Sequence, residues 1–101
     1  MRRVFEIALY RVEYVQDFES VKNRHAEGCT AFHAQIAREL SLAAAEQGME
    51  LPVPVHVAAM GVQALFDGVL QSWLLNRDGF DLEATSRDTM DVYLRGLGFR
   101  L

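Results

Sequence analysis

Cysteine and proline are almost absent from this sequence. The single cysteine, Cys29, excludes a disulfide within the chain and is typical of a reducing compartment. The two prolines, Pro52 and Pro54, stand close together and interrupt any helix there, so we predict that residues 49–54 form a loop. The sequence has no glycine-rich phosphate-binding loop. Charged residues near its start leave no uncharged core, so we expect no signal peptide.

Positive charge is also scarce. Ten Lys and Arg residues stand against fourteen Asp and Glu residues, and the formal net charge is −4. Nucleic-acid binding needs a basic surface that neutralises phosphates, so this balance argues against DNA binding by the chain alone. It does not exclude a neighbouring basic domain.

The sequence is rich in helical periodicity. Half of its 101 residues are hydrophobic and 24% are charged, as in one globular domain with a modest core. We find no convincing strand, internal repeat or second domain. The periodicity predicts helices over residues 3–20, 21–47, 55–76 and 81–97. Gly48 ends the second, residues 77–79 form a turn and Asp81 caps the fourth. The predicted fold class is all-α, an antiparallel helical bundle.

The predicted third helix is the most informative part of the chain. Residues 57–75 contain only four conventional polar side chains, and the rest are apolar or small. A helix that is apolar nearly all round is buried on several sides, which in so short a chain suggests a partner subunit. The segment approaches the length of a membrane span. Its aligned polar residues and two glycines instead favour a buried helix in a protein without a membrane contact.

Small residues along one side of this helix predict a symmetric dimer. Gly61, Ala64, Gly68 and Ser72 would let a second helix approach closely, and Trp73 adds large apolar area. The third and fourth helices would then meet their twins in a four-helix bundle. Packing inside the monomer is the alternative. The predicted dimer interface comprises Gly61, Ala64, Leu65, Gly68, Ser72, Trp73, Met90, Tyr93, Leu94 and Leu97.

A polar line on the same helix leads to a second hypothesis. Gln63, Asp67 and Gln71 recur every four residues, so they lie on one narrow strip. The strip is either exposed to solvent or faces a cavity walled by the first two helices, where a few polar groups among apolar walls form a small-molecule pocket. The predicted ligand-binding residues are Phe5, Leu9, Val12, Cys29, Phe32, Ile36, Val62, Gln63, Phe66 and Asp67.

No metal, cofactor or catalytic site is predicted. His25, Cys29 and His33 recur every four residues, but His33 drifts about 80° around the helix from His25 and no fourth ligand is apparent. They are better interpreted as core or solvent-edge residues. A small helical enzyme using His25, His33 or Asp67 is a weaker alternative, because nothing supplies an acid–base pair beside a substrate site.

Several segments together resemble one protein family. Residues 2–7 (RRVFEI) and 11–15 (RVEYV) are similar to the middle of the effector domain in TetR-family repressors of the AcrR branch. Residues 67–75 (DGVLQSWLL) and 80–82 (FDL) resemble the last third of that domain. Residues 91–94 (DVYL) and Leu97 are similar to its closing helix. The resemblance covers nearly the whole chain in the same order and spacing.

The resemblance implies a cytoplasmic, all-helical homodimer that regulates transcription and is not an enzyme. In such proteins an N-terminal helix-turn-helix binds operator DNA. A C-terminal helical domain binds hydrophobic, often aromatic or cationic effectors, which release the operator and typically induce a multidrug efflux pump. The resemblance places the pocket on the helices that carry Phe5, Leu9, Phe32, Ile36, Val62, Phe66 and Asp67. It places the dimer contact on residues 57–75 and 81–97.

The DNA-reading head of that family has no counterpart in residues 1–101. We therefore expect a single effector-binding and dimerisation domain, either a fragment or a free-standing module, that contacts DNA only through a missing domain. The alternative is a helical dimerisation module without a ligand cavity.

Overall fold

The computed structural model describes residues 3–7 and 25–101, and side chains for residues 3–7 and 31–101. Residues 3–7 are helical, and three longer helices follow: α2 (His25–Glu46), α3 (Val55–Leu75) and α4 (Leu82–Leu97). No strand occurs within these ranges. The all-α prediction is confirmed. Residues 8–20 of the predicted first helix and residues 21–24 of the second lie outside the described ranges.

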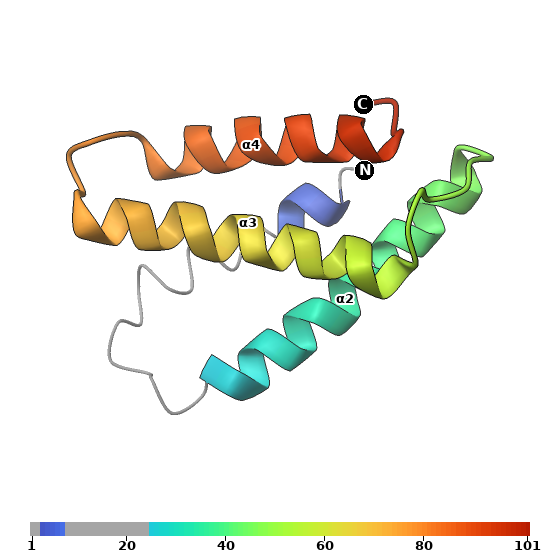
Figure 1. The fold of residues 1–101 in the computed structure, drawn as a ribbon, viewed down its shortest axis with the longest axis horizontal. Helices are drawn as coiled ribbons and strands as arrows, with labels where there is room; N and C mark the ends of the chain where they lie inside the picture. The colour runs from blue at the N-terminus through green and yellow to red at the C-terminus, as the bar shows by residue number, and fades with distance from the viewer. Residues whose placement is uncertain (1–2, 8–24) are drawn as a thin grey trace.

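Helix α3 is the centre of the arrangement. It packs against α2 on one side and against α4 on another. Figure 1 shows α4 running back along α3, whereas α2 crosses α3 steeply and residues 3–7 lie near the C-terminal half of α4. In the part of the chain that is described, no helix is both long and apolar enough to span a membrane.

The predicted start of α4 is confirmed in atomic detail. The carboxylate of Asp81 accepts a hydrogen bond of 2.8 Å from the backbone N–H of Ala84, which would otherwise lack a partner in the first turn. The helix ends at Leu97 as predicted, and α3 ends at Leu75, one residue before the predicted end.

Glycines end both α2 and α4 in the same way. Gly48 and Gly98 have φ angles of +61° and +108°, a left-handed conformation that favours glycine. Beyond Gly48, the N–H of Met49 bonds to the carbonyl of Ala44, and the N–H of Phe99 bonds correspondingly to Leu94. These six-to-one bonds define Schellman motifs, which satisfy carbonyls at the two helix ends.

The core lies where α2, α3, α4 and residues 3–7 meet. Ile36 and Leu40 from α2, Val62 from α3, and Met90 and Leu94 from α4 are all fully buried. Val4 is also buried, so the short N-terminal helical segment contributes to this core. Burial of large aliphatic side chains from every described helix is the main source of stability.

Candidate functional site

Four of the predicted ligand-binding residues meet between α2 and α3. The rings of Phe32 and Phe66 pack edge to face, with centroids 6.3 Å apart and an interplanar angle of 69°. Ile36 and Val62 are fully buried in the same hydrophobic cluster. Leu9 and Val12 lie outside the described residues, and Cys29 lies outside the described side chains. The pocket remains a prediction, and its described walls are mutually packed.

The polar strip of α3 changes in exposure along its length. Gln63 and Asp67 are half-buried, whereas Gln71 is exposed. Of the two interpretations of the polar strip, full exposure to solvent therefore applies only to Gln71. The N-terminal part of the strip lies at the edge of the core, where polar groups would border a cavity if one opens.

His33 of α2 carries a buried polar atom. It follows Phe32 on α2, and its Nδ1 is buried without a hydrogen-bond partner among the described residues. A buried, unsatisfied ring nitrogen is unfavourable unless a ligand or water completes it. Within the described residues, no three His, Cys, Asp or Glu side chains are grouped to hold a metal ion.

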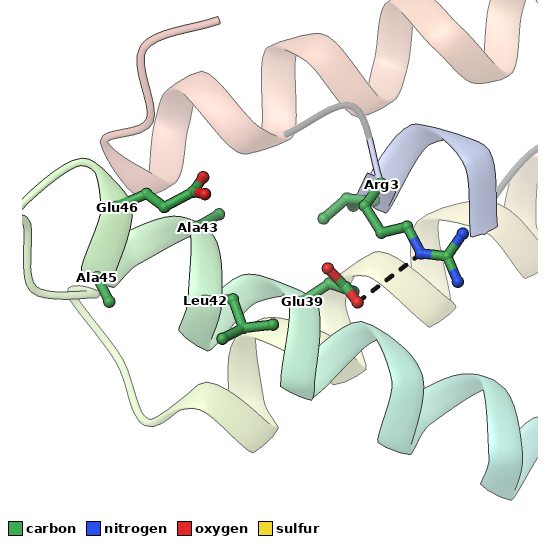
Figure 2. A pocket seen from close by; sticks show the side chains of 7 residues that line it. Arg3, Glu39, Leu42, Ala43, Ala45 and Glu46 are labelled. Carbon is green, nitrogen blue, oxygen red and sulfur yellow. Dashed lines mark ion pairs between the residues drawn. The ribbon is translucent and has the colours of Figure 1, made fainter.

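Hollows in the described surface lie elsewhere. One of about 460 Å³ separates residues 3–7 from the C-terminal half of α2. Figure 2 shows Arg3 and Glu39 on its rim, with Leu42 and Ala43 nearby. Arg3 Nε lies 3.8 Å from Glu39 Oε1, an ion pair between an exposed arginine and a half-buried glutamate at the surface, where such pairs have a small energetic effect. Phe5 borders a different hollow, together with Arg87, Asp88 and Asp91 of α4.

One side of α3 is both apolar and exposed. We call Val57, Met60, Ala64, Gly68 and Leu75 the α3 outer face, because all five are exposed and recur every three or four residues, apart from a longer step in which the exposed polar Gln71 lies on the same side. Val57 is 45% exposed, Met60 55% and Leu75 82%. On α4, Val92 is 71% exposed and lies opposite the buried Met90 and Leu94.

The predicted dimer residues fall into two groups. Ala64, Gly68 and Ser72 are exposed, and Leu65 and Trp73 are half-buried. Met90, Leu94 and Leu97 are instead buried within the protomer. The list of predicted interface residues does not include Val57, Met60, Leu75 and Val92, although all four lie within residues 57–75 and 81–97, where the resemblance places the dimer contact.

Gly61 serves a contact within the protomer. An added Cβ there would overlap the hydroxyl oxygen of Tyr93 and stand 2.6 Å from its Cζ. The Tyr93 hydroxyl donates a hydrogen bond of 2.9 Å to the carbonyl of Ala58, one turn earlier on α3. Burial raises the pKa of Tyr93 above its ordinary value of 10.0. This is the intramolecular packing that the sequence left open as an alternative.

Comparison with known proteins identifies the family. Residues 1–99 match the model of the C-terminal region of MAATS-type transcriptional repressors, a TetR C-terminal family. No curated protein and no solved structure matches the chain significantly. The match does not distinguish the AcrR branch, which stays a prediction. Because the family model covers all but the last two residues, and the helices described above agree with it, the chain belongs to this family of TetR-type transcriptional repressor C-terminal regions.

Proposed function

We propose that this chain is the ligand-sensing and homodimerisation domain of a cytoplasmic TetR-like repressor that controls a multidrug efflux gene in response to hydrophobic compounds. The exposed apolar α3 outer face, in a chain of a repressor family, is the observation that carries the proposal. DNA recognition would reside in a basic helix-turn-helix beyond these 101 residues, whose own net charge is −4.

The dimer part of the proposal rests on the shape of the α3 outer face. The small residues Ala64 and Gly68 lie in the middle of this face, and the larger side chains of Met60 and Leu75 lie towards its two ends. The same strip on a second copy would be complementary under a two-fold axis, which is how most soluble homodimers form. Val92 of α4 is also apolar and exposed, and it precedes Tyr93, which contacts Gly61 of α3, so α4 would contribute apolar area to the same four-helix contact.

Gly68→Leu tests this surface without disturbing the protomer. No atom lies within 4 Å of a Cβ built on Gly68, so a leucine fits the isolated chain. We expect the wild-type chain to sediment as a dimer and Gly68→Leu to raise the dimer dissociation constant at least tenfold. Ala34→Leu, on an exposed position of α2, is the matched control and should leave it unchanged. A Gly68→Leu dimer as tight as wild type would refute this interface.

The sensing part rests on the contact between α2 and α3. The effector would enter beside Phe32 and Phe66 and border the half-buried Gln63 and Asp67. His33 Nδ1, buried without a hydrogen bond among the described residues, would gain a partner from it. The effector acts only through its different affinity for two arrangements of the helices, which shifts their populations.

Rhodamine 6G, an aromatic cation, is a suitable probe for this site. We expect its fluorescence anisotropy to rise on titration with the 101-residue chain, and His33→Phe to weaken binding several-fold. His56→Phe, at an exposed position on α3, is the matched control and should not change the affinity. Absence of binding by rhodamine 6G and by a panel of uncharged aromatic compounds would remove the sensing role.

A second candidate is a helical dimerisation module without a ligand cavity. Close packing of Phe32, Ile36, Val62 and Phe66 favours it, because a core filled at normal density admits no ligand. Xenon uptake separates the two candidates. Binding of xenon beside Phe66 in a pressurised crystal would support the chamber, and a xenon-free core together with no dye binding would support the module.

A further inference from the structure

The last residues of the chain are fastened to the end of α2. Gln47 directly follows α2, and its side-chain Nε2 donates a hydrogen bond of 2.8 Å to the carbonyl of Arg100. The N–H of Arg100 donates in return to Gln47 Oε1, also at 2.8 Å. The two bonds form a closed ring between one side-chain amide and one backbone residue, 53 positions apart in the chain.

Further contacts around Gln47 and Arg100 support this pair of hydrogen bonds. Gly98 and Gly48 hold the two helix ends in Schellman motifs, which set the directions of the flanking residues. A Cβ on Gly98 would lie 3.4 Å from the terminal methyl of Met49, so the two turns pack directly against each other. The Arg100 guanidinium also reaches to 3.4 Å from the Gln47 carbonyl, where its charge complements the C-terminal dipole of α2.

We propose that the Gln47–Arg100 junction is a latch that makes the C-terminal turns of α2 and α4 move as one unit. Helices α2 and α4 each pack on α3, and the latch adds a direct connection between their ends. A shift of α2 along its axis must either break the two bonds or carry the end of α4 with it. Tightly packed interfaces respond to small shifts in this two-state manner.

The consequence for regulation rests on the proposed function. Effector binding would act on α2 through Phe32 and Ile36, whereas the partner copy would contact α4 through Val92. The latch would then transmit a displacement of α2 to the dimer surface, without a contact between effector and partner. Both latch residues lie outside the proposed pocket and outside the α3 outer face.

Amide hydrogen exchange of the 101-residue chain tests the latch itself. Gln47→Ala removes both side-chain bonds. We expect exchange at the amides of both Arg100 and Met49 to accelerate at least threefold, because one side of the junction no longer holds the other. Gln35→Ala, at an exposed position of α2, is the matched control and should change neither amide. Acceleration on only one side, or on neither, would overturn the proposal.

Three further variants separate the latch from general weakening. Arg100→Ala keeps the two hydrogen bonds between the backbone of residue 100 and the Gln47 side chain. Its effect on amide exchange should therefore be smaller than that of Gln47→Ala. Removal of residues 100 and 101 should reproduce the effect of Gln47→Ala on the Met49 amide, and the combination should accelerate that amide no further. Additive effects of the truncation and Gln47→Ala would show that the two changes act independently, and would contradict the latch.

The regulatory consequence is measured by sedimentation with rhodamine 6G. In the wild type the dye should change the dimer dissociation constant, and in Gln47→Ala this change should shrink towards onefold while dye affinity stays within twofold. An undiminished change would refute the coupling and leave the proposed function standing. If the dye does not bind, the sensing function fails, and hydrogen exchange alone decides whether the latch exists.

Discussion

Replacing Gly61 with alanine should destabilise the protein, against the usual trend for glycine inside a helix. The added methyl group would overlap the Tyr93 hydroxyl and stand 3.1 Å from its Cε1. The ring cannot simply turn away, because its hydroxyl is bonded to the Ala58 carbonyl and its neighbours Met90 and Leu94 are fully buried. Either α4 moves away from α3, or Tyr93 leaves its position.

The expected size follows from three opposing effects. Overpacking costs about 1–3 kcal/mol, and loss of the Tyr93–Ala58 hydrogen bond costs about 1 kcal/mol. The higher helix propensity of alanine contributes about 1 kcal/mol in the other direction. The free energy of unfolding should therefore fall by about 1–3 kcal/mol. At about 4–8 °C per kcal/mol for a domain of this size, the Tm should fall by roughly 10 °C.

Gly68→Ala provides a matched control on the same helix. Among the described residues, no side chain or neighbouring element lies within 4 Å of a Cβ built there, so the protomer itself should show only the gain of about 1 kcal/mol in helix propensity. Urea denaturation followed by circular dichroism, at several protein concentrations, measures both variants and separates any effect on dimerisation. A Gly61→Ala variant as stable as wild type would refute the reasoning. Equal losses in both variants would refute it too, since they would indicate a cause other than Tyr93.

A double mutant isolates the contact between the two helices. Tyr93→Ala removes the ring that obstructs a side chain at position 61. Adding Gly61→Ala to Tyr93→Ala should therefore raise the free energy of unfolding by about 1 kcal/mol through helix propensity, and the two changes should be non-additive by about 2–4 kcal/mol. Additive losses would mean that alanine at position 61 is unfavourable for a reason unrelated to Tyr93.

Three other changes probe local features, each by urea denaturation. Asp81→Ala should lower the free energy of unfolding by about 1 kcal/mol because the Ala84 N–H loses its acceptor, whereas Asp81→Ser should retain most of it. Gly98→Ala should cost about 1–2 kcal/mol because its φ of +108° is unfavourable for alanine, and Gly96→Ala, with open space around its Cβ, should not. The pKa of Tyr93 is raised by burial, so the neutral phenol contributes fully to the free energy of unfolding below pH 10.0. This contribution is lost as the pH rises through the folded-state pKa. Tyr93→Phe should lack this loss of stability at alkaline pH.

The local features of the fold were predictable because they depend on neighbouring residues. An aspartate before an apolar periodic segment accepts a hydrogen bond from the first turn, and a glycine after one permits the left-handed turn that ends it. Asp81 and Gly48 therefore predict two helix ends from the sequence, and the structure confirms both predictions. The Gln47–Arg100 bonds join residues 53 positions apart, and no local pattern encodes such a pair.

The candidate site was predictable only in part, for a different reason. Helical periodicity identifies apolar faces but not the neighbour that covers each one. The apolar face of residues 81–97 predicts a dimer contact that includes Met90 and Leu94, and in the protomer both side chains are fully buried. Gly61 has the small side chain expected where two helices meet, and the helix that meets it here is α4 of the same protomer. Only the three-dimensional arrangement distinguishes these alternatives.

The composition of α3 is consistent with the proposal that the helix has three neighbours. Contacts with α2 and α4 account for its buried residues Ala58, Ala59, Val62 and Phe66. They do not account for Val57, Met60 and Leu75, which are apolar yet exposed in the protomer. Exposed apolar residues gathered along one side of a helix often mark a contact surface, although the exposed Gln71 interrupts this strip before Leu75. Under the proposed function, a second copy of the chain is this third neighbour. The proposed Gln47–Arg100 latch would then connect that contact to α2 without passing through α3.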